Sequence, residues 1–134
     1  MKHKKEVLSV LWIFVTLNYL YCDLIGLMDS SMLKQYLTGS VEGLEINEHF
    51  LLYAGILMEI PIMMVLLSRI LAKKANVWAN VFAGSIKTLA MVATLFVGSF
   101  TSYYLFFAII EIATTIFIVG YAIHWLRQKN DEIA

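Results

Sequence analysis

Three ionisable residues lie about halfway along long apolar stretches of the chain: Glu59, Lys87 and Glu111. A charge at the centre of a lipid bilayer costs at least ~2.5–3.5 kcal/mol. If the three side chains meet, Lys87 can neutralise one carboxylate, and the other must be protonated, hydrogen-bonded or paired with a group outside the chain. The pattern therefore predicts either a site for a proton, an ion or a small ligand, or a structural charge network.

The depths of these three residues match. At 1.5 Å per helical residue, Glu59 and Lys87 each lie ~16 Å from the start of their apolar stretches, and Glu111 lies ~15 Å from the start of its own. Each is then near the middle of a hydrocarbon core that is ~30 Å thick. Because facing lipid is the costly alternative, we expect all three side chains to point into the interior of a helix bundle.

The residues around Lys87 and Glu59 fit such an interior. Asn80 and Gly84 share the helical face of Lys87, and small or polar residues are typical of closely packed helix interfaces in membranes. Pro61 follows Glu59 by two residues and cannot donate a hydrogen bond to the preceding turn. We therefore expect a kink beside Glu59 and include Asn80 in the candidate site.

Three more residues complete the candidate site. Thr115 follows Glu111 by one helical turn, and Tyr104 precedes it by two turns. Asp23 lies near the end of the first apolar stretch, where it could either stay hydrated or line the entrance to the charged cluster. The predicted ligand- or proton-binding residues are therefore Glu59, Lys87, Glu111, Asp23, Asn80, Thr115 and Tyr104.

The elements that must position these residues are transmembrane helices. The chain is 60% hydrophobic over 134 residues, and the apolar residues gather in four long stretches. Each stretch has about the ~20 residues that a helix needs to span a bilayer, whereas a β-barrel would show shorter alternating segments. We predict an all-α fold, a single membrane domain over residues 1–134, with spans at about 7–28, 48–71, 76–98 and 101–126.

The basic residues predict the orientation of the spans. Eight of the ten Lys and Arg residues fall before the first span, from the end of the second span to the start of the third, or after the end of the fourth. Because cytoplasmic segments carry an excess of Lys and Arg, both termini are expected in the cytoplasm. The eight residues are Lys2, Lys4, Lys5, Arg69, Lys73, Lys74, Arg127 and Lys129.

A long outer loop is expected between the first two spans. Ser30 or Ser31 can cap a short helix that runs to Thr38 and stops at Gly39. Asn47 can then cap the second span. The short helix is expected either to form part of an ordered loop at the membrane surface or to act as a lid.

Several classes of function lack support in the sequence. The formal net charge is zero, so no general attraction to nucleic acid is expected. The single cysteine, Cys22, excludes a disulfide framework within the chain, and no pair of histidines has the spacing of metal ligands. Catalytic serine, cysteine and phosphate-loop patterns are also missing, so no metal, cofactor or catalytic residue is predicted, and a role other than enzyme is favoured.

Seven short stretches of the chain are distinctive: Trp12-x-Phe14, Asn18–Asp23, Glu59–Met64, Leu67–Arg69, Trp78–Asn80, Tyr104–Phe107 and Glu111–Thr115. Together they resemble a family of small bacterial four-span membrane proteins of unknown function. The resemblance implies a four-span architecture and a bacterial inner membrane, and it implies no activity. A looser likeness, in architecture only, links Asp23 and Glu59-Ile60-Pro61 to the emopamil-binding and sigma-2-receptor group, which are also four-span bundles.

Three functions remain open at this point. The favoured one is a membrane protein that binds or transports a small cationic or lipophilic ligand or protons at the charged site. Such a protein could form a homo-oligomer in its lipid bilayer. The second is a scaffold or subunit without catalytic activity, in which the charges hold the helices in register. The third is a membrane enzyme that acts on a lipid-like substrate with Glu59 or Glu111 as proton donor or acceptor.

Overall fold

Helices make up nearly all of the structure, a computed structural model that describes residues 2–41, 43–96 and 100–128. Within these residues the helices are α1 (Lys2–Met28), α2 (Ser30–Thr38), α3 (Glu48–Ile70), α4 (Lys73–Thr94) and α5 (Ser102–Arg127). A short antiparallel hairpin, β1 (Ser40–Val41) with β2 (Leu44–Glu45), connects α2 to α3. The prediction of an all-α fold is confirmed, with this small hairpin as an addition.

The helices α1, α3, α4 and α5 are each long and apolar enough to cross a membrane. Two of them begin earlier than predicted, α1 at Lys2 rather than Val7 and α4 at Lys73 rather than Asn76. Long basic side chains are good helix formers, so the helices continue past the apolar stretches that mark the spans. Two predicted features lie outside the described residues: the end of the third span at Gly98, and Lys129.

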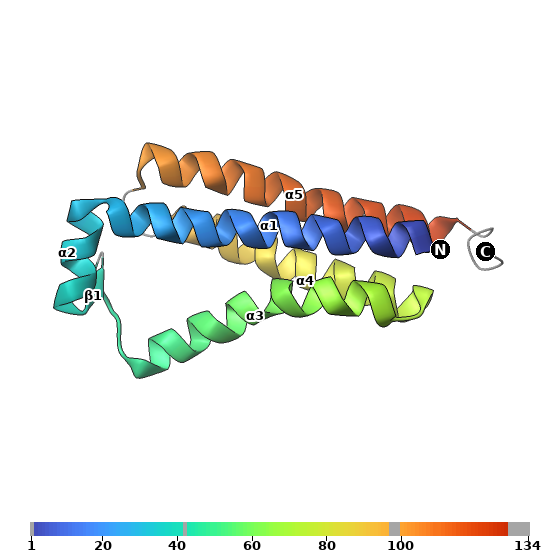
Figure 1. Cartoon of the computed structure of the whole chain (residues 1–134), viewed down its shortest axis with the longest axis horizontal. Helices are drawn as coiled ribbons and strands as arrows, with labels where there is room; N and C mark the ends of the chain where they lie inside the picture. Colours follow the sequence, from blue (N-terminus) through green and yellow to red (C-terminus); the bar gives the residue numbers. More distant parts are fainter. Residues whose placement is uncertain (1, 42, 97–99, 129–134) are drawn as a thin grey trace.

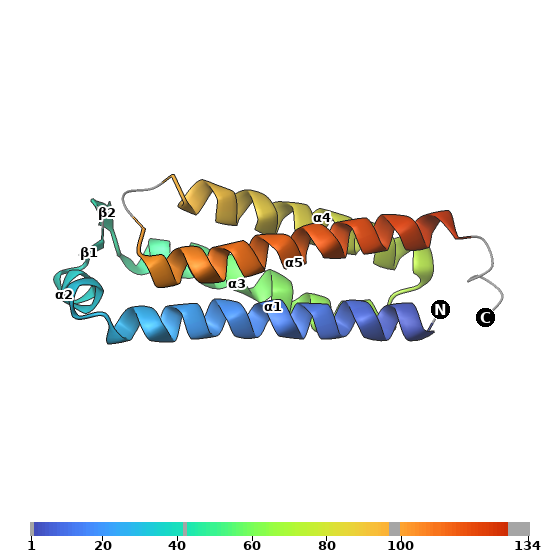
Figure 2. The same ribbon diagram turned by 90° about the horizontal axis from the view of Figure 1, so that it is seen from above.

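The four long helices lie side by side, as Figures 1 and 2 show. Helix α1 begins and α5 ends at one end of the bundle, which we call the termini end; α2 and the hairpin lie at the other, which we call the α2 end. Helix α1 packs on α3 and α5, and α4 packs along α5. The fully buried core includes Leu8, Trp12, Val15, Val77, Ile118 and Trp125.

Helix α3 is the least enclosed of the four. In its most apolar stretch 11% of the residues are buried, against 28% in each of the other three long helices. Pro61 lies inside α3 and is buried, and the two halves of α3 run in different directions in Figure 1. Because proline removes one backbone hydrogen bond and crowds the preceding turn, we attribute this change of direction to Pro61. The half of α3 before Pro61 diverges from the bundle toward the α2 end.

The connection between α1 and α3 is ordered by local hydrogen bonds. The predicted short helix is confirmed, but its cap is Asp29 rather than Ser30 or Ser31, and Asp29 accepts a 3.0 Å hydrogen bond from the Ser31 N–H. Gly39 ends the helix with φ of 80°, a left-handed conformation that favours glycine. Asn47 caps α3 as predicted, accepting a 2.8 Å hydrogen bond from the Phe50 N–H.

Candidate functional site

Glu111 lies on α5 with its side chain in the interior of the bundle. It is 1% exposed, and neither carboxyl oxygen has a hydrogen-bond partner among the described residues. Polar groups that are buried in proteins are normally hydrogen-bonded, because an unpaired one loses its solvation without compensation. Glu111 is therefore a costly side chain to bury, and its position is the first indication of a functional site.

Lys87 on α4 is buried beside groups that are poor partners for an ammonium. It is 2% exposed, and its Nζ lies 3.8 Å from the Met58 sulfur and 4.2 Å from the centroid of the Tyr19 ring. The ring face attracts a cation, which offsets part of the cost of burying Lys87. The Tyr19 hydroxyl is itself buried without a hydrogen-bond partner in the described part of the chain.

The opposite charges of Lys87 and Glu111 interact without touching. Each lies within electrostatic range of the other, yet the described residues contain no contact of 4.0 Å or less between the ammonium and a carboxylate. Two such groups can attract a polar or charged molecule that reaches either of them. Both side chains are buried, as expected, and their role as a binding site stays a prediction.

Asp23 belongs to this cluster through its charge. Its side chain is exposed on α1, one turn beyond Tyr19, but it lies within electrostatic range of both Lys87 and Glu111. This arrangement fits the alternative in which Asp23 lines the entrance to the cluster. With all three groups ionised, the cluster carries one more negative charge than positive.

The prediction that Glu59 points into the bundle is wrong, because its side chain is exposed. Pro61, Met64 and Ser68 form the buried face of α3. At about 100° per residue, Glu59 lies about 160° around the helix from Pro61. Its depth along the helix placed it near the middle of the bundle, but its rotational position places it on the outer surface.

Asn80 is buried in a separate polar network nearer the termini end. Its Oδ1 accepts a 2.7 Å hydrogen bond from the Trp12 indole and lies 3.4 Å from the Ser68 hydroxyl. Its Nδ2 donates to the side-chain oxygen of Asn76 at 2.7 Å. These bonds connect α1, α3 and α4, so Asn80 is satisfied by the protein and does not join Lys87 as predicted.

Thr115 and Tyr104 lie on either side of Glu111 along α5. The Thr115 hydroxyl is 2.7 Å from that of Thr88 on α4, one turn from Glu111 toward the termini end. Tyr104, two turns toward the α2 end, has its hydroxyl 2.6 Å from that of Thr94. Both residues hold α4 against α5, and Thr115 lies next to the charged cluster.

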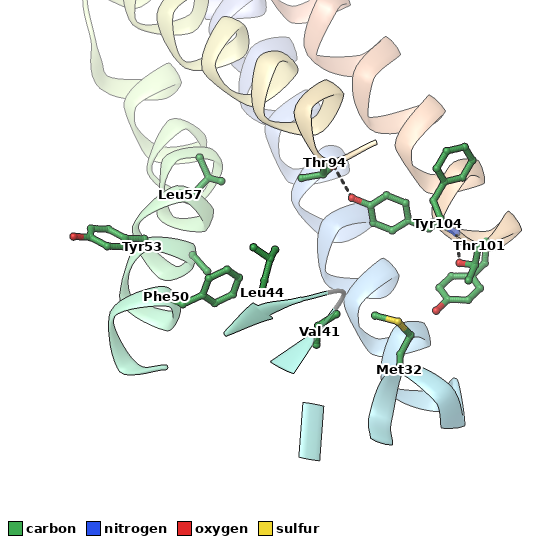
Figure 3. Close-up of a pocket in the computed structure, with 12 residues that line it drawn as sticks. Met32, Val41, Leu44, Phe50, Tyr53, Leu57, Thr94, Thr101 and Tyr104 are labelled. Carbon is green, nitrogen blue, oxygen red and sulfur yellow. Dashed lines mark hydrogen bonds between the residues drawn. The ribbon is translucent and has the colours of Figure 1, made fainter. Parts of the chain in front are cut away.

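A pocket of about 460 Å³ opens at the α2 end, where α3 diverges from α4 and α5. Figure 3 shows its walls, with Phe50, Leu44 and Leu57 on one side and Tyr104, bonded to Thr94, on the other. None of the described residues that line it is charged. The volume is within the range of small-molecule sites. The sequence did not predict this pocket, because it depends on the direction of α3.

The pocket approaches the charged cluster from the α2 end. Leu57, which lines the pocket, directly precedes Met58, which contacts Lys87. Tyr104 lies two helical turns from Glu111, a separation of about 10 Å along α5. A molecule in the pocket would therefore lie within electrostatic range of Glu111.

Sequence reasoning missed two members of the cluster. The Lys87 ammonium lies over the ring of Tyr19. Tyr19 is one turn before Asp23 on the same face of α1, and this spacing could have identified it. Met58 gave no such signal, because an apolar residue in an apolar helix is unremarkable until the rotation of that helix is known.

Comparison with known families identifies the family of the chain. A family model described as a family of unknown function (DUF6326) matches residues 1–133. The chain belongs to this family. No curated protein and no solved structure matches the chain. The likeness to the emopamil-binding group thus gains no support, and membership of DUF6326 brings no activity with it.

Proposed function

We propose that this protein is an integral membrane protein that binds a small lipophilic cation, with the cation's apolar part in the pocket and its charge attracted by Glu111. The observation that carries the proposal is the buried Glu111 carboxyl group, whose two oxygens have no partner among the described residues. The proton is the smallest cation that this group can take.

The electrostatics of the cluster favour a cation. When both carboxyl groups are ionised, Glu111 and Asp23 together outweigh the single positive charge of Lys87. The aromatic rings of Phe50, Phe100 and Tyr104 around the pocket suit a lipophilic cation, because ring faces attract positive charge. At about 10 Å and an effective dielectric constant of about 20, one carboxylate stabilises a cation by roughly 1.7 kcal/mol.

The alternative functions have less support. A structural ion pair that holds helices in register would bring Lys87 into direct contact with a carboxylate, and the described residues contain no such contact. A lipid-acting enzyme would need a carboxylate in the wall of an apolar pocket, and the described residues that line the pocket include none. Ligand binding accounts for both observations.

The proposal is tested with tetraphenylphosphonium, a lipophilic cation, and with tetraphenylborate, an anion of similar size. We expect the cation, but not the anion, to raise the thermal unfolding midpoint of the detergent-purified protein. Glu111→Gln should abolish most of this shift, whereas Glu59→Gln, a matched change outside the cluster, should retain it. Equal responses to both ions, or a full shift in Glu111→Gln, would contradict the proposal.

The orientation is part of the same proposal. The basic residues near the termini end, among them Lys4, Lys5 and Lys74, favour the cytoplasmic side for both termini, in a bacterial inner membrane as the sequence resemblance implies. A reporter that is active only outside the cytoplasm should then be inactive on either terminus and active when inserted after Gly39. Activity at one terminus alone would contradict the four-span arrangement.

A further inference from the structure

Glu59 is an ionisable side chain on the outer surface of the most apolar part of α3. It is exposed on the bundle, about halfway along a helix that is long enough to span a membrane. A charge that faces the centre of a bilayer is costly and is normally turned toward a partner. Within one copy of the described chain Glu59 has no such partner, so we expect a second molecule to pack against the surface around it.

The residues around Glu59 form a continuous exposed strip. Leu52, Gly55, Glu59, Ile62 and Leu66 follow one another at alternating spacings of three and four residues, and all five are exposed; we call them the α3 seam. This spacing is that of the contact positions of two helices that pack side by side. Gly55 has nothing within 4 Å of the place where a Cβ would be, so a second helix can approach closely there.

We propose that the α3 seam is a homodimer interface, in which the Glu59 carboxyl groups of two copies hydrogen-bond to each other. A two-fold axis along the membrane normal would place the two seams parallel, with Glu59 opposite the same residue at the same depth. A neutral carboxyl group both donates and accepts a hydrogen bond, so it is its own complement. One polar residue in an apolar seam also fixes the register of the two helices.

A second copy can offer Glu59 a carboxyl group at the same depth, but no basic side chain there. Within the described part of the chain, Lys87 is the one basic residue near this depth, and it is buried. The other described basic residues lie near helix ends or on α2. Helix α3 is also the least enclosed long helix, so it has the most surface left for another copy to cover. The inference is independent of the proposed cation site.

The test is cysteine crosslinking in membranes, in a Cys22→Ser background so that each variant carries one cysteine. Ile62→Cys places a thiol in the seam, and Leu89→Cys places one on the exposed face of α4, where the side chain is 70% exposed. We expect oxidation to give a band at twice the monomer mass for Ile62→Cys and little or none for Leu89→Cys. Both variants change exposed residues and should keep the unfolding midpoint of the background protein.

A second measurement isolates Glu59. In liposomes, Glu59→Ala should raise the dimer dissociation constant about 3- to 16-fold, the range expected for hydrogen bonds between membrane helices. Glu59→Gln can still donate and accept, and should change it less than about twofold. Equal crosslinking at both positions, no dimer band for Ile62→Cys, or a band that joins Ile62→Cys to a different protein would each overturn the proposal.

Discussion

Asn80 shows how a polar residue inside a membrane bundle can be structural. It accepts the Trp12 indole N–H at 2.7 Å and donates to Asn76 at 2.7 Å, so its polar atoms are satisfied by protein groups. Glu111, equally buried on α5, has no such partners in the described structure. The two residues differ in partners rather than in burial, and this difference separates a packing role from a candidate binding role.

Replacement of Asn80 by alanine should therefore destabilise the fold without affecting the charged cluster. Asn80→Ala leaves the buried Trp12 indole N–H and the Asn76 amide oxygen unpaired, at a cost of about 1–3 kcal/mol. Asn18→Ala is the control, because within the described residues Asn18 bonds only the Phe14 carbonyl of its own helix. Thermal unfolding of the detergent-purified variants measures both. Equal midpoints for Asn80→Ala and Asn18→Ala would show that the network contributes nothing.

The sequence located Lys87 and Glu111 but not the orientation of Glu59, for a physical reason. Residue type and depth are enough when a helix has a polar face, as α4 does with its buried Asn80, Gly84 and Lys87. Helix α3 is apolar on nearly all sides, so its sequence does not mark which side is buried. The rotation of α3 follows from packing with α1, which a single sequence does not encode in an obvious pattern.

At the scale of the helices, the close contact of α4 with α5 positions the two halves of the charged cluster. A Cβ added to Gly84 would lie 2.7 Å from the Val119 Cγ2 and 3.4 Å from the Thr115 carbonyl oxygen. The valine side chain is stiff and the carbonyl belongs to the backbone, so neither can move far. Glycine at this position therefore sets the distance between the helices that carry Lys87 and Glu111.

Gly84→Ala should separate α4 from α5 and destabilise the protein by about 1–3 kcal/mol, the usual cost of overpacking. Gly120→Ala on α5 is a matched control, because nothing lies within 4 Å of its added Cβ. That change should be neutral or slightly stabilising, since alanine favours helix over glycine by about 1 kcal/mol. The thermal unfolding midpoints of the two variants measure these changes in stability. A neutral Gly84→Ala would mean that the helices are less closely packed than described.

At the scale of the whole molecule, the divergence of α3 connects the pocket to the cluster. Pro61 was visible in the sequence and predicted a kink, but the pocket that opens between α3 and the α4–α5 pair depends on the direction of the bend. The existence of four apolar helices could be predicted from composition and length alone. The relative tilt of those helices could not, because it arises from contacts between residues far apart in the chain.

We propose that the charges of Glu111 and Lys87 govern the binding of a cation. The affinity of the protein for a lipophilic cation tests this directly. Tetraphenylphosphonium binding would be measured by equilibrium dialysis for the wild type, Glu111→Gln and Lys87→Gln. If both groups are charged about 10 Å from the bound cation, Glu111→Gln should weaken binding about 15-fold and Lys87→Gln should strengthen it by a similar factor. Affinity changes in the same direction in both variants, or affinities that match the wild type in both, would show that these charges do not govern cation binding.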